Sequence, residues 1–165
     1  MERIAYRLIA GTVVGMLVAG AAWAGDSETN RRSLKGIHAV RILVEMRNLD
    51  EDGGLHPSQV RAEVEKQLRR AGIALTAQRG TPYLYVNVEA VKHADLPLYG
   101  YIIDVELRQA ARVVLHPEIV VFADTWSIHS IGTSAAGDLA SHLRVKLATH
   151  VELFIEAYLA MNRRR

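Results

Sequence analysis

The sequence predicts an α+β fold, a two-layer sandwich in which two helices cover one face of a mostly antiparallel four-stranded sheet. Four segments alternate apolar and polar residues, as half-buried strands do. Two further segments repeat apolar residues every three or four positions, which is typical of amphipathic helices. The resulting order is β-α-β-β-β-α. Two helices with one apolar stripe each can cover only one face of such a sheet.

The first strand and first helix are expected at 36–47 and 57–71. Val40, Ile42 and Val44 share one side of the strand. Pro57 suits the first turn of the helix, where its missing N–H leaves no hydrogen bond unmade. Gly72 suits the position just after the helix, where a left-handed cap is common. Together with the next predicted strand, at 83–91, the first strand and helix form a strand-helix-strand unit, which favours a parallel pairing of its two strands.

Three more strands are predicted at 83–91, 99–114 and 119–128, with a possible short edge within 75–80. Their short links favour antiparallel pairing. After a loop at 132–137, a second helix runs to about Met161 on a single apolar stripe. The sheet face away from the helices is expected to stay uncovered. It would carry Arg41, Leu43, Tyr83, Tyr85, Asn87, Glu89, Ile102, Asp104 and Glu106.

Residues 1–24 have the layout of a secretory signal peptide. Arg3 and Arg7 precede an apolar run of about 14 residues, shorter than the roughly 20 that span a bilayer. Ala22 and Ala24 occupy the small-residue positions of a cleavage site. We expect export by the general secretion route, cleavage after Ala24 and a periplasmic or secreted protein. A retained membrane anchor is the alternative.

The rest of the chain is predicted to be one domain that does not span a membrane. A flexible lead-in is expected at 25–35, a single α+β domain at 36–162 and a basic tail at 163–165. The chain has no cysteine, so neither a disulfide nor a lipid on a cysteine can form. Its formal charge of +2 is close to neutral and argues against a nucleic-acid partner.

No catalytic, cofactor or metal motif stands out. Asp124 and His129 are five residues apart, so in a regular strand they leave opposite faces, and a shared metal would require a bulge. His142 and His150 are eight apart on the last helix and are expected on its exposed flank. No G-x-S-x-G nucleophile motif occurs. We therefore predict no cofactor, no metal and no catalytic residue.

Aromatic residues on three neighbouring strands are the best candidates for binding. We predict a binding surface formed by Tyr83, Tyr85, Tyr101 and Trp126, because tyrosine and tryptophan are enriched at binding hot spots. The alternative is a structural role, since cross-strand aromatic pairs stabilise sheets by roughly 0.2–1 kcal/mol each.

Five segments resemble a family of small, signal-bearing bacterial proteins without a known activity. They are 68–73 (LRRAGI), 82–88 (PYLYVNV), 105–109 (VELRQ), 125–126 (TW) and 154–162 (FIEAYLAMN). The resemblance implies a periplasmic α+β protein and no particular reaction. The order of elements is also similar to small envelope modules, such as the amino-terminal domain of the Tol propeller protein and the lipoprotein activators of peptidoglycan synthases. That second likeness is one of topology alone.

These observations predict a non-catalytic periplasmic module that binds an unknown protein or envelope component. One alternative is a small metal-assisted hydrolase that uses Asp124 and His129. Another is a protein that binds a small apolar ligand between sheet and helices. The oligomeric state does not follow from the sequence.

Overall fold

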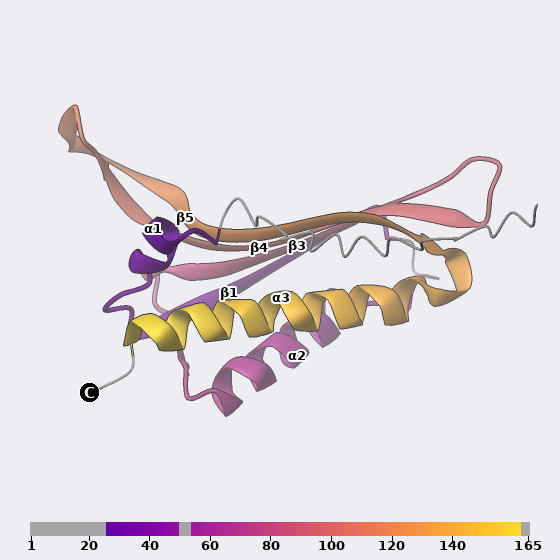
Figure 1. Cartoon of the computed structure of the whole chain (residues 1–165), viewed down its shortest axis with the longest axis horizontal. Helices are drawn as coiled ribbons and strands as arrows, with labels where there is room; N and C mark the ends of the chain where they lie inside the picture. Colours follow the sequence, from indigo (N-terminus) through magenta and orange to yellow (C-terminus); the bar gives the residue numbers. More distant parts are fainter. Residues whose placement is uncertain (1–25, 50–53, 163–165) are drawn as a thin grey trace, which may run out of the picture.

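The computed structural model describes residues 26–49 and 54–162. The predicted signal peptide at 1–24 and basic tail at 163–165 lie outside these residues. Within them the chain is an α+β sandwich of a sheet and a helical layer (Figure 1). The sheet has five strands in the order β2-β1-β3-β4-β5. No helix among the described residues is long and apolar enough to cross a membrane.

The parallel half of the sheet follows the predicted strand-helix-strand unit. Strand β1 (Ala39–Arg47) pairs in parallel with β3 (Tyr83–Lys92), and helix α2 (Pro57–Arg70) connects them. The helix buries the predicted stripe, which consists of Val60, Val64 and Leu68. The predicted short edge is β2 (Ala74–Leu75), parallel to the start of β1.

The antiparallel half consists of β3, β4 (Leu98–Val113) and β5 (His116–Ala135). Strand β5 is longer than predicted, since it begins at His116, before the predicted start at 119, and includes most of the expected loop at 132–137. The long β4 supplies backbone partners at both ends, from Leu98 opposite Ala135 to Val113 opposite His116. Ladder hydrogen bonds thus outweigh the loop-like composition of these segments.

The predicted sheet of four strands and layer of two helices is correct in class but incomplete. The fifth strand is β2, and the third α-helix is α1 (Glu28–Arg32), which lies in the predicted flexible lead-in. That prediction is wrong for residues 26–35. The Ser27 side chain accepts a hydrogen bond from the backbone N–H of Asn30, and Leu34 is fully buried. Capping and burial therefore hold a segment that polar composition assigns to a loop.

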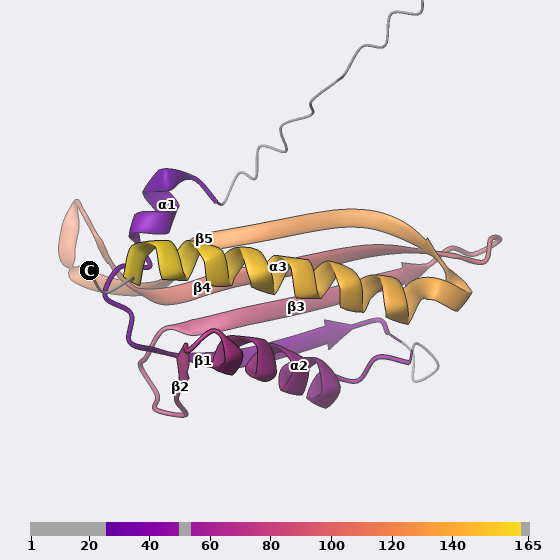
Figure 2. The same cartoon turned by 60° about the horizontal axis from the view of Figure 1, so that its bottom comes forward.

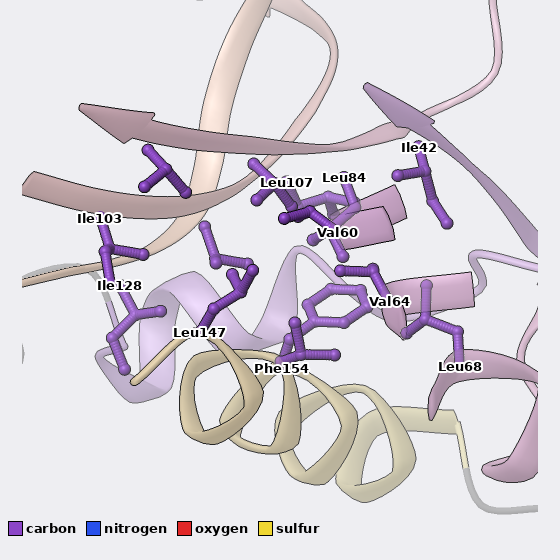
Figure 3. Packing of buried hydrophobic residues seen from close by; sticks show 14 of the residues in the cluster. Ile42, Val60, Val64, Leu68, Leu84, Ile103, Leu107, Ile128, Leu147 and Phe154 are labelled. Atoms are coloured by element: carbon purple, nitrogen blue, oxygen red, sulfur yellow. The ribbon is translucent and has the colours of Figure 1, made fainter. Parts of the chain in front are cut away.

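The core lies between the sheet and helices α2 and α3 (Leu139–Asn162) (Figures 2 and 3). The rings of Trp126 and Phe154 meet edge to face, with centroids 5.3 Å apart. Helices α2 and α3 pack on this one face of the sheet, and α1 lies beside β5, where it contacts α3 and β5. The fully or nearly fully buried side chains labelled in Figure 3 are Ile42, Val60, Val64, Leu68, Leu84, Ile103, Leu107, Ile128, Leu147 and Phe154.

Candidate functional site on the uncovered sheet face

The face of the sheet that points away from the helices is the candidate site. Along each strand its side chains alternate with the buried ones, so the pairing register places them in rows across the sheet. One row is Glu45, Asn87, Asp104 and His129. All nine residues predicted for this face lie on it. We call this surface the open face.

Tyr85 is the most buried aromatic residue of the open face, at 7% exposure. Its hydroxyl donates a hydrogen bond to Glu45, with an oxygen–oxygen distance of 2.6 Å. Burial, followed by the bond to Glu45, raises the pKa of Tyr85 to about 12. The Arg108 guanidinium lies over the Tyr85 ring, 4.0 Å from its centroid. This tyrosine is therefore held at both its ring and its hydroxyl.

Arg108 also joins two carboxylates at 2.7 Å each, Glu106 on its own strand and Asp124 on β5. Glu106 is only 8% exposed. Burial and the negative charge of Asp124 raise its pKa, against the lowering effect of Arg108. The pKa of Arg108 is raised, despite its burial, by Tyr83 and these two carboxylates. A charged residue with several partners has little freedom, so this part of the face is preorganised.

His129 extends the same network along the row described above. Its Nδ1 lies 2.9 Å from a carboxylate oxygen of Asp104 and 4.0 Å from Glu106. Asn87 donates a hydrogen bond to the other oxygen of Asp104 at 2.9 Å. We use the name face network for the side chains that these contacts link. They are Glu45, Tyr85, Asn87, Asp104, Glu106, Arg108, Asp124 and His129.

The bulge on which the Asp124–His129 hypothesis depended is present. Leu107 pairs with Trp126 and Arg108 with Asp124, which leaves Thr125 as an extra residue in β5. Asp124 and His129 therefore point to the same face. Each binds a different partner, however, and no group of three or more His, Asp or Glu in the described parts of the chain is placed to hold a metal ion. Asp124 and His129 are thus engaged by Arg108 and Asp104 rather than by each other.

Two of the four predicted binding residues lie on the other side of the sheet. Trp126 is fully buried, and its indole N–H donates a hydrogen bond to Asp26 at 2.7 Å. Tyr101 is 5% exposed, and its hydroxyl lies 2.8 Å from Nε2 of His142 on α3. The four aromatic residues therefore do not form one surface, because Tyr101 is in phase with the buried Ile103 and Trp126 with the buried Ile128. The alternation of residues along each strand is the sequence pattern that predicts this placement.

The histidines of α3 also differ from the expected exposed pair. His150 is 2% exposed, and burial, followed by the charge of Lys146, lowers its pKa to about 4. His142 is half-buried against Tyr101, with ring centroids 5.3 Å apart. Both therefore belong to the packing of the helix on the sheet.

A shallow hollow of about 350 Å³ lies at the end of the open face near the β3–β4 turn. Its apolar wall includes Val91, Ile102 and Ile131, beside Glu89. This hollow is not predictable from the sequence, because it depends on which side chains of three strands meet. The alternative of a small ligand between sheet and helices is not favoured, since that space holds buried core side chains (Figure 3).

The comparisons with known proteins leave the family open. No family model matches the chain, and no curated protein matches it. Among solved structures, the chain is similar to a minor lipoprotein from Acinetobacter baumannii, known from a crystal structure at 2.35 Å. The identity is 8% and the TM-score 0.28, over 73% of this chain and 91% of that one. A likeness of this size establishes neither a shared fold nor a shared function.

Proposed function

We propose that this protein is a non-catalytic binding module of the cell envelope, and that its open face holds a partner protein. One observation carries the proposal: the helices pack on one side of the sheet, while the other side presents side chains that are fixed by each other. An expected signal peptide agrees with an envelope location. The proposal concerns a surface and requires no reaction.

The composition of the open face suits protein recognition. Tyrosine and arginine dominate binding hot spots, and here Arg108 stacks on Tyr85 before any partner arrives. Because these side chains are already ordered, little conformational entropy would be lost on association. Leu43 and Ile102 lie on the same face at 37% and 38% exposure and add apolar contact area. The acidic and basic groups together favour a partner with a mixed polar surface.

The same residues are poorly placed for catalysis. Glu106, whose pKa is raised, and His129 are the residue types that general acid–base chemistry uses. The carboxylate of Glu106 is engaged by Arg108, and His129 is 46% exposed on a sheet surface. Active sites usually lie in concave pockets that exclude water. Binding is therefore the function that this arrangement supports best.

Site-specific photocrosslinking in the producing cells tests the proposal. A photoreactive amino acid at Leu43 or Ile102 samples the open face, and one at Val145 on α3 is the matched control, since Val145 is 66% exposed on the helical side. We expect discrete crosslinked species from the two face positions and not from Val145. Mass spectrometry of these species would identify the partner.

A second variant separates binding from folding. Ile102 is 38% exposed and lies in a paired strand, so Ile102→Ser should lower the free energy of unfolding by about 1 kcal/mol. The folded protein should keep its circular dichroism spectrum while crosslinking from Leu43 falls several-fold. Equal crosslinking from Val145, or undiminished crosslinking in the folded Ile102→Ser protein, would contradict the proposal.

A further inference from the structure

The β4–β5 hairpin continues beyond the rest of the sheet as a projecting arm, residues 110–122. Strand β3 begins at Tyr83, which pairs with Arg108, so the arm has no third strand beside it. In Figures 1 and 2 it extends past the end of the helical layer. Most of its exposed side chains are apolar. They are Val114 (90% exposed), Leu115 (86%), Ile119 (44%), Val120 (53%), Val121 (43%) and Phe122 (54%).

Apolar side chains occupy both faces of the arm and its turn. Phe122 lies on the side of the open face, where its ring contacts Tyr83 with centroids 6.0 Å apart. Val121 alternates with it and points to the other side. Val114 and Leu115 form the tip. A partner protein with a flat surface would cover only one face of the arm. A lipid layer into which the tip inserts would cover both faces and the turn.

The end of the molecule that bears the arm is basic. Strand pairing and the hydrogen bond from Ser33 to Thr125 bring together the segments 26–41, 65–83 and 108–124. These segments hold ten Lys and Arg residues and five Asp and Glu residues. The other described residues hold five basic and nine acidic ones. The charge of the described chain is thus segregated, with the positive end around the arm.

We infer that the arm inserts into the interfacial layer of an anionic phospholipid bilayer, with the basic end against the headgroups. Charge complementarity and an apolar tip are the two features of interfacial membrane binding. The insertion is shallow, because the unpaired strand edges of the arm cannot be satisfied in hydrocarbon. Glu118 in the arm opposes anionic lipid, but it lies 3.4 Å from His116, and Arg112 donates a hydrogen bond to the backbone carbonyl of the preceding Pro117.

Vesicle co-sedimentation tests this inference. The probes are vesicles of phosphatidylglycerol with phosphatidylethanolamine, and vesicles of phosphatidylcholine alone. We expect the protein to bind the anionic vesicles more tightly, with affinity that falls as salt rises. The double variant V114S/L115S should bind at least about tenfold more weakly, because two aliphatic side chains no longer leave water on binding. V145S, a matched change at another exposed valine, should bind like the unmodified protein.

A fluorescent reporter locates the contact. In Leu115→Trp, the emission should shift to the blue with anionic vesicles and be quenched by lipids brominated on their chains. All proteins compared carry the same N-terminus, so a difference between them reports on the arm. The face network is unchanged in every variant, so failure here leaves the proposed function standing.

Three results would overturn the inference. One is the absence of binding to anionic vesicles, and another is equal binding by V114S/L115S and the unmodified protein. The third is a dimer in analytical ultracentrifugation that V114S/L115S dissociates without lipid, since the arm would then be covered by a second copy through its β5 edge.

Discussion

The two faces of one sheet use the same residue types in opposite ways. On the covered face, Trp126 and Tyr101 are buried against the helical layer, where Trp126 packs on Phe154 and Tyr101 meets His142. On the open face, Tyr83 and Tyr85 each lie beneath an arginine guanidinium. These residues lie on β3, β4 and β5, which are adjacent strands of the same sheet. Whether an aromatic residue supports the core or a surface therefore depends on its phase along the strand.

The largest expected effect is that of Trp126→Ala. It should lower the free energy of unfolding by about 3–5 kcal/mol, because it leaves a cavity against Phe154 and removes the hydrogen bond to Asp26. Tyr83→Ala, on the open face and half-buried, is the matched change and should lower it much less. Urea unfolding followed by circular dichroism measures both. Similar losses in the two variants would break the comparison between the faces.

Gly132→Ala tests how closely the covered face is packed. Gly132 pairs with Tyr101, and a Cβ at this glycine would overlap the hydroxyl end of the Tyr101 ring. We expect a loss of about 1–3 kcal/mol from overpacking. In a double-mutant cycle with Tyr101→Ala, the two losses should be far from additive. Additive losses would show that Tyr101 is not what the new methyl group meets.

The smallest effect concerns the open face and its pH dependence. The pKa of Glu106 is raised in the folded protein, so the folded state binds its proton more tightly than the unfolded state. Glu106 therefore adds stability at low pH, and this contribution is lost as the pH rises through the raised pKa. Relative to Glu106→Gln, the unmodified protein should therefore gain stability over the acidic pH range in which the pH falls through the raised pKa of Glu106 towards the ordinary glutamate value.

Urea midpoints of the two proteins across this window measure the effect. Asp26 and Glu45 have lowered pKa values and act in the opposite direction, but both are present in each protein. Burial raises the pKa of Asp26, but the hydrogen bonds from Arg31 and Trp126 outweigh this effect and lower the pKa overall. Hydrogen bonds from Tyr85 and Arg47 lower the pKa of Glu45. If the stability difference between the two proteins shrinks on acidification, the interaction with Arg108, rather than burial, dominates the pKa of Glu106.

Much of the candidate site was predictable, because the open face follows from alternation within single strands. The alternation of Tyr83 and Tyr85 with Leu84 and Val86 is enough to place both tyrosines. The same rule applied to Tyr101 would have placed it in the core. The arm was harder to foresee, since its residues show strand propensity and only the length of β3 reveals that nothing lies beside them.

The sequence by itself determined the positions of four strands and the two long helices and the side of each that is apolar, because these depend on neighbours within a few residues. Tertiary structure decided the bulge at Thr125, the burial of Leu34 and the partners of Arg108. Each of these depends on contacts between segments far apart in the chain, as in the hydrogen bond from Trp126 to Asp26. Such contacts require the tertiary fold, which brings those segments together.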